Sequence, residues 1–211
     1  MVGYGPQYAR AVLRPLAEQV AAAIGDDTAV RVLDGDCGEL AAALRAAAWW
    51  RRVDVVQRFD DVAGSGVMFA SLCTVGDDAS MLLRVREPPR RNAVIVAAWD
   101  SASPPAHERA LLEAMRAGGR DAAPLQRFFT SVEPLRDEGF TVTALADVAR
   151  FDSVAHCWNA LALERADTLQ LGSLSREVLG ALQDELARRL QPYSAADGTL
   201  RIPFTAGLLT F

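Results

Sequence analysis

Few residue types in this chain can carry chemistry, and the inventory excludes several reaction classes. The 211 residues include two histidines, His107 and His156, three cysteines, and 22 basic residues that are all arginine. Without lysine there is no amine for a Schiff base or for a P-loop phosphate contact. The cysteines have no C-x-x-C spacing and the histidines are far apart, so no zinc motif is present. Carboxylates, hydroxyls, arginines and the backbone remain.

The most suggestive of these residues form an acidic, glycine-containing segment, Asp34-Gly35-Asp36-Cys37-Gly38. It follows a short apolar run, 29–33, and precedes an alanine-rich helical stretch, 39–50. In a strand, loop and helix of this kind, glycines let the backbone approach a ligand and the helix directs its first N–H groups at it. Asp34 and Asp36, with Glu39, also have a spacing known from divalent-cation sites, but we expect no metal here.

The elements that must position this segment alternate between helix and strand. Apolar residues with a 3.6-residue period predict helices over 7–24 and 39–50. A third helix is predicted to start at Ser103, with Pro104 next. Two later helices are predicted to be capped by Asp152 or Ser153 and by Ser175. Apolar runs predict strands at 29–34, 53–57, 66–73, 92–99, 140–145 and 200–211. This alternation predicts a mainly parallel α/β sheet. Pro203 in the last strand indicates a sheet edge or a bulge.

Charge and hydropathy limit the partners. A net charge of -5 gives no basic face for nucleic acid. No run of 18 apolar residues is available to span a membrane, and the first residues form no secretory signal. Unpaired cysteines fit a reducing compartment. We therefore expect a soluble cytoplasmic protein, and the alanine-rich, lysine-free composition favours a bacterial source.

Four stretches of the sequence resemble motifs of one protein family and occur in the same order as in that family. They are RVLDGDCGELA at 31–41, LRVREP followed by AVIVAAWD within 83–100, GFTV at 139–142, and QPY followed by GTLRIP within 191–203. With them the chain resembles class I S-adenosylmethionine-dependent methyltransferases that act on small molecules, over nearly its whole length.

The resemblance implies an α/β fold, a three-layer Rossmann-like methyltransferase sandwich. Its sheet is mainly parallel, with the last two strands as an antiparallel hairpin at one edge. One domain, 1–211, is expected, with an N-terminal helical extension (1–25), a cofactor half (26–100) and a substrate half (101–211).

The resemblance also implies S-adenosylmethionine as cofactor, bound at Asp34, Gly35, Asp36 and Gly38. The sequence departs from the family here, because Asp36 stands where the first glycine belongs and two later loop residues have no counterpart. A carboxylate at this place opposes the carboxylate of the cofactor. The predicted cofactor site is therefore shorter and more acidic than the family pattern.

A second departure is the distance of 66 positions from Asp34 to Asp100, which holds one strand before 66–73 where the family has two strands and a helix. One strand-helix unit is thus predicted to be missing. If it is the second strand, which we favour, no ribose ligand remains. If it is the third, Asp60 or Asp61 is the acid that binds the ribose hydroxyls.

Candidates for the reaction itself are sparse. His107 lies where the resemblance places substrate-facing residues and is a candidate general base, with an exposed helix histidine as the alternative. We expect His156-Cys157 to serve packing or surface, and Trp49, Trp50 and Trp99 to lie in the core or at an interface.

Three functions stay open on this sequence. The first is methyl transfer from S-adenosylmethionine to a small-molecule ligand. The second is a non-catalytic methyltransferase-like binding or partner protein, as a homodimer or with another chain. The third is reuse of the fold for a small-molecule reaction without S-adenosylmethionine.

Overall fold

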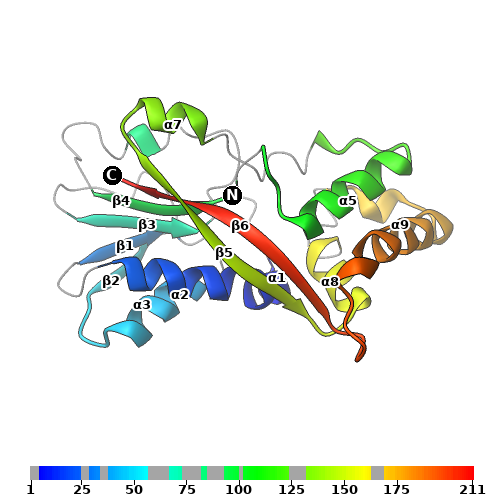
Figure 1. The fold of residues 1–211 in the computed structure, drawn as a ribbon, viewed down its shortest axis with the longest axis horizontal. Helices are drawn as coiled ribbons and strands as arrows, with labels where there is room; N and C mark the ends of the chain where they lie inside the picture. The colour runs from blue at the N-terminus through cyan, green and yellow to red at the C-terminus, as the bar shows by residue number, and fades with distance from the viewer. Residues whose placement is uncertain are drawn as a thin grey trace.

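A computed structural model describes residues 5–24, 29–33, 38–56, 67–72, 82–84, 93–99, 102–123, 132–162 and 169–211. These residues form a six-stranded sheet with the order β2-β1-β3-β4-β6-β5 (Figure 1). The strands are β1 (Val30–Leu33), β2 (Val53–Val56), β3 (Met68–Leu72), β4 (Val94–Ala98), β5 (Thr141–Phe151) and β6 (Leu200–Thr210). The first four are mutually parallel, whereas β6 runs antiparallel to both β4 and β5. The predicted α/β class, parallel sheet and antiparallel edge are confirmed.

The helices lie on both faces of this sheet and beyond its end. In chain order they are α1 (Pro6–Tyr8), the π-helical η1 (Ala9–Leu13), α2 (Arg14–Ala23), α3 (Glu39–Ala47), α5 (Ala106–Ala117), α7 (Glu133–Asp137), α8 (Val154–Leu161), η4 (Leu171–Ser173), α9 (Arg176–Leu190) and η5 (Gln191–Tyr193). Figure 1 shows α2 and α3 along one side of the parallel strands, α7 on the other, and α5, α8 and α9 grouped past the end of the sheet. None of the helices in the described part of the chain is long and apolar enough to cross a bilayer.

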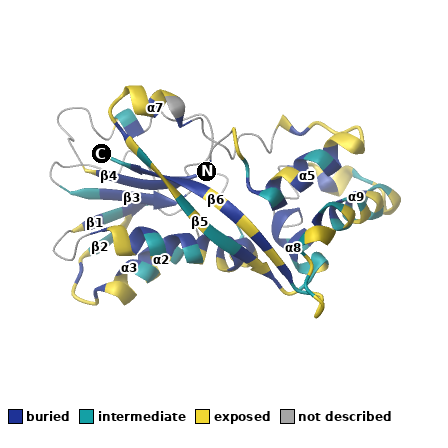
Figure 2. Ribbon diagram, in the orientation of Figure 1, coloured by how far each residue is buried: buried dark blue, intermediate teal, exposed yellow. Residues whose placement is uncertain are grey.

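Strand β4 shows how the sheet divides the interior into two cores. All five of its side chains are buried (Figure 2), as expected for a central parallel strand covered on both faces. Ile95 and Ala97 belong to the larger core under α2 and α3, while Val94 and Val96 belong to a smaller core with residues of α7. The period of two along a strand sends alternate side chains to opposite faces, which gives three layers.

The fifth strand is longer than the sequence predicted. The strand predicted at 140–145 continues to Phe151 as β5, and it pairs with β6 from Thr141↔Thr210 to Phe151↔Leu200. The cause is this pairing with β6; at the far end buried Ala149 and Phe151 flank exposed Arg150, as in a half-buried strand. β4 pairs with β6 only over residues 207–210. The β5–β6 ribbon therefore extends past the parallel sheet to the helices α5, α8 and α9 (Figure 1).

The predicted start of α5 at Ser103 is wrong, because the helix begins at Ala106 with Pro105 as its N-cap. Pro105 restricts the residue before it, Pro104, to extended backbone, so no helix can pass through this pair. The predicted caps Ser153 and Ser175 are confirmed, each accepting a hydrogen bond from the backbone N–H three residues on. The helix predicted over 39–50 ends at Ala47.

Candidate functional site

The strand order reverses its direction of winding between β1 and β3. From β1 the chain crosses through α3 to β2 on one side, whereas β3 and β4 lie on the other side. In open α/β sheets, ligands bind at the carboxyl ends of the strands where the direction of winding reverses in this way. Here that point adjoins the start of α3, the helix that follows β1.

Gly38 forms the N-cap of α3 and has the backbone geometry of a ligand-binding loop. Its φ of +80° lies in the left-handed region, and a Cβ placed on it meets no atom within 4 Å. Gly38 itself has no side chain with which to cap the helix. The start of α3 follows the carboxyl end of β1, and the positive end of a helix dipole favours an anionic group.

Glu39, the next residue, is held away from this helix end by an ion pair. Arg14 of α2 donates from Nε to Glu39 Oε2 at 2.9 Å and from Nη2 to Oε1 at 3.3 Å. The hydrogen bond to Glu39, aided by its charge, raises the pKa of Arg14. Because the carboxylate is neutralised by Arg14, the acid in the first turn of α3 does not repel an anion at Gly38.

Most of the predicted cofactor residues lie outside the described residues. These are Asp34, Gly35 and Asp36 after β1, and the two alternative ribose acids, Asp60 and Asp61. β2, which precedes those acids in sequence, pairs directly with β1. That is the place of the second strand in a doubly wound sheet, so the favoured prediction that the second strand is lost is wrong.

His107 is not an exposed helix residue but part of the interior. Its side chain is fully buried, its Nε2 lies 3.3 Å from the Tyr8 hydroxyl, and its ring packs near those of Phe151 and Phe204. The spacing of the buried residues Leu111 and Met115, four and eight positions on, is the sequence signal that places it on the buried stripe of α5. As a candidate general base, His107 has its imidazole in the core rather than on a cavity wall.

A cavity of about 510 Å³ lies between the extension of β6 and the start of α5. We call it the Arg109 pocket. Its lining comes from the segment after β4, the first turn of α5, the ribbon and η5: Ser103, Pro104, Pro105, Ala106, Arg109, Ala146, Asp147, Val148, Tyr193, Pro203, Phe204 and Thr205. Sequence reasoning missed it, since these residues come from four separate segments.

The Arg109 pocket exists because β6 has an unpaired edge there. β4 leaves β6 at Gly207, and an isolated bridge joins Leu200 to Ser194 at the other end. Pro203 lies between these points and pairs with β5 on one side only. Since proline has no N–H to donate, its predicted preference for an edge is met at this place.

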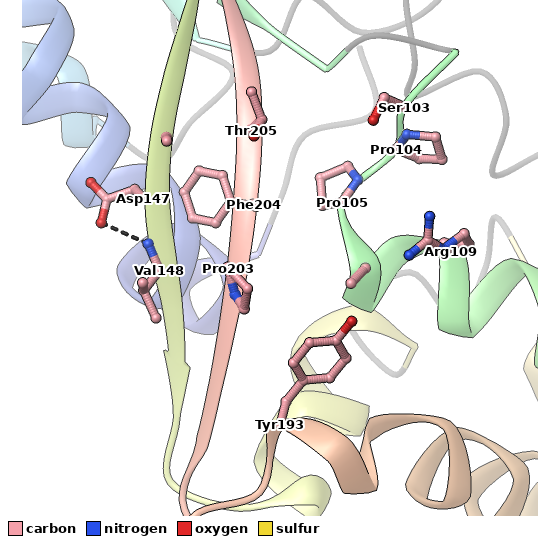
Figure 3. Close-up of a pocket in the computed structure, with 12 residues that line it drawn as sticks. Ser103, Pro104, Pro105, Arg109, Asp147, Val148, Tyr193, Pro203, Phe204 and Thr205 are labelled. Atoms are coloured by element: carbon pink, nitrogen blue, oxygen red, sulfur yellow. Dashed lines mark hydrogen bonds between the residues drawn. The ribbon is translucent and has the colours of Figure 1, made fainter.

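Figure 3 shows how the polar groups of the Arg109 pocket are arranged. Arg109 stands on α5, and the Tyr193 hydroxyl points toward the start of that helix. Asp147 lies across the ribbon from both of them. Its carboxylate accepts a hydrogen bond from Gln19 Nε2 at 2.6 Å and another from the Val148 N–H at 2.7 Å. The carboxylate is therefore engaged away from Arg109.

The remaining candidates, His156 and Cys157, have structural roles in the described part of the chain. Cys157 is buried, and His156 lies on the same helix with its Nδ1 3.3 Å from an Asp152 carboxylate oxygen. The Cys157 pKa is raised, mainly by burial and further by the charge of Glu108. Among the described residues, no three His, Cys, Asp or Glu side chains gather into a group able to hold a metal ion.

Of the three tryptophans predicted to lie in the core or at an interface, Trp99 is buried against Phe204, with ring centroids 5.3 Å apart. Trp49 and Trp50 are 84% and 59% exposed, so neither lies in the core.

No protein-family model matches the chain, and no curated protein does. Similar solved structures align with it over nearly its full length. The Escherichia coli protein YjhP has a TM-score of 0.43 at 15% identity, covering 97% of this chain and 98% of its own. A proposed methyltransferase from Bacillus halodurans has a TM-score of 0.42 at 12% identity, covering 93% and 96%. A SAM-dependent methyltransferase from Thiobacillus denitrificans, solved with S-adenosyl-L-homocysteine, has 0.37 at 13% identity, covering 99% and 92%. Because all three scores are below 0.5, these likenesses assign no activity or ligand to this chain.

Proposed function

We propose that the protein binds S-adenosylmethionine at the β1–β3 crevice and transfers its methyl group to a small molecule in the Arg109 pocket. The observation that carries the proposal is the reversal of strand order beside Gly38, a glycine with left-handed backbone at the start of α3. This is the geometry with which an α/β sheet holds a cofactor.

The described residues fit the cofactor. Gly38 places no side chain at the start of α3, and this helix end favours the carboxylate of an amino-acid group. The pairing of Glu39 with Arg14 removes one of the negative charges near the site. When bound, the cofactor supplies an electrophilic methyl group on a sulfonium.

The position of the Arg109 pocket supports the second half of the proposal. Its first lining residues follow β4, whose carboxyl end at Ala98 pairs with Gly207. β4 lies two strands from β1, which is about 10 Å at the usual strand spacing of about 4.8 Å. Both proposed sites thus adjoin the carboxyl edge of the same sheet, as the proposal requires.

This chain's part in the reaction is to bind and orient. His107 is buried and does not line the pocket, so no described histidine takes a proton there. Methyl transfer tolerates this, because holding a nucleophile in line with the sulfonium supplies much of the rate enhancement.

Calorimetric titration with S-adenosylmethionine and S-adenosylhomocysteine tests the proposal. We expect saturable heat with both, and a rise in melting temperature with S-adenosylhomocysteine, since a ligand bound only by the native state stabilises it. Absence of heat and of any thermal shift at millimolar ligand would contradict the proposal.

A second candidate function is a non-catalytic partner protein, and the exposure of Trp49 and Trp50 favours it. The two rings meet edge to face with centroids 5.8 Å apart, and Val55 of β2 is 40% exposed. Large exposed apolar side chains that cluster mark interaction surfaces. Light scattering on the wild type and on a Trp49→Ser, Trp50→Ser variant tests this: a dimer lost in the variant supports it, and a monomeric wild type without a co-purifying chain contradicts it.

A further inference from the structure

The Arg109 pocket contains one cation that no protein group neutralises. Arg109 is exposed on α5, and its guanidinium makes no ion pair or hydrogen bond with any residue in the described part of the chain. The other charged lining residue, Asp147, is engaged by Gln19 and by the Val148 N–H. An anionic ligand would therefore find a guanidinium with its donors available for a bidentate contact.

The helix that carries Arg109 adds to this positive potential. α5 begins at Ala106, a residue of the pocket lining, and no side chain caps it. The positive end of a helix dipole therefore adjoins the same cavity that holds Arg109. Both contributions are positive. Of the two carboxylates nearby, Asp147 accepts from Gln19 and the Val148 N–H, and Glu108 in the first turn of α5 is buried and does not line the pocket. We therefore expect the Arg109 side of the pocket to favour an anion.

Proline and aromatic side chains form two opposite parts of the lining, beside polar Ser103, Thr205 and Tyr193. Pro104 and Pro105 form part of one side, and Pro203 and Phe204 of β6 form part of the other (Figure 3). Phe204 is fixed by the edge of Trp99 and is nearly buried. Walls of proline and aromatic rings suit a flat apolar body, and the Tyr193 hydroxyl supplies one hydrogen bond.

We propose that the Arg109 pocket binds a small aromatic carboxylic acid, with its carboxylate on Arg109 and its ring between the proline segment and β6. That this acid is the methyl acceptor rests on the proposed function. Binding of the acid itself does not rest on the proposed function, since no residue of the cofactor crevice lines the pocket.

The test uses three probes of one shape in the absence of cofactor: 4-hydroxyphenylacetate, its neutral amide, and the cation tyramine. Affinities are measured by calorimetry or ligand-observed NMR on the full chain. We expect the acid to bind, the amide to bind at least tenfold more weakly, and tyramine not to bind. Equal affinity for acid and amide, or no binding of the acid at millimolar concentration, overturns the proposal.

Variants locate the binding. Arg109→Gln is expected to weaken binding of the acid at least tenfold without changing the affinity for the amide. Arg116→Gln, an exposed arginine in the last turn of the same helix, is the matched control and should leave both unchanged. Tyr193→Phe removes only the hydroxyl and should lower the affinity for every probe that binds. An acid affinity that survives Arg109→Gln, or falls equally in Arg116→Gln, overturns the assignment.

The two proposals fail separately. Acid binding without any response to S-adenosylhomocysteine would leave the acid site standing and overturn methyl transfer. A response to S-adenosylhomocysteine without acid binding would overturn only the acid site.

Discussion

Replacing Gly38 by alanine tests whether this glycine serves only the backbone conformation or also borders a bound ligand. At φ +80° a side chain costs about 1–2 kcal/mol of backbone strain. The loss of unfolded-chain entropy returns about 0.4–1 kcal/mol. No atom lies within 4 Å of the added Cβ, so no clash adds to this, and the net destabilisation is about 1 kcal/mol. For a chain of this size that lowers the melting temperature by about 2–4 °C.

Gly198 is the matched control, since its φ is +83° and its Cβ position is equally open. Urea unfolding should show the same loss of stability in Gly38→Ala and Gly198→Ala. Calorimetry with S-adenosylhomocysteine should show at least tenfold weaker binding, about 1.4 kcal/mol, in Gly38→Ala alone. Unchanged binding in Gly38→Ala, or equal weakening in both variants, would refute the role of the Gly38 backbone.

Three further predictions concern other parts of the molecule. His107→Ala should lower the free energy of unfolding by about 3 kcal/mol in urea, because it empties a fully buried ring site; a change under about 0.5 kcal/mol would mean that the residue is exposed. Cys157 should resist alkylation in the native protein at mildly alkaline pH and react after unfolding, because burial and the charge of Glu108 raise its pKa; peptide mapping distinguishes it from Cys37 and Cys73, and rapid native labelling would contradict this. The hydrogen bond from Arg188, with help from Arg189, lowers the Glu185 pKa below its ordinary value of 4.5, so the stability that this carboxylate contributes is present above that pH and is lost as pH falls through the lowered value. Glu185→Gln should therefore be less stable than wild type at neutral pH and equal to it in strong acid, and a difference that persists in acid would contradict the ion pair.

The central part of the fold could be predicted because its signals are local. An apolar run such as 94–98 is buried on both faces, and serine caps at Ser153 and Ser175 act within one turn. The extension of β5 to Phe151 was missed because its stability comes from pairing with β6 about 50 positions away in sequence. No local pattern reports such a partner.

The candidate site also has parts that follow from local sequence signals and parts that depend on contacts between distant segments. Gly38 was predicted because a glycine loop between a strand and a helix is a local motif. The Arg109 pocket was not, because Arg109, Tyr193 and Pro203 meet only after the ribbon folds back on α5. His107 was predicted on the surface or at a site, and its burial follows from the same contact, which packs Phe204 near its ring.

The most direct measurement of the proposed function locates the cofactor on the sheet by amide chemical shifts during titration with S-adenosylhomocysteine. We predict that the large shifts fall at the carboxyl ends of the parallel strands, at Leu33, Gly38 and Leu72, while Val30 and Met68 at the amino ends stay in place. Saturable shifts confined to the amino ends or to the outer helices, or no shift at millimolar ligand, would contradict it.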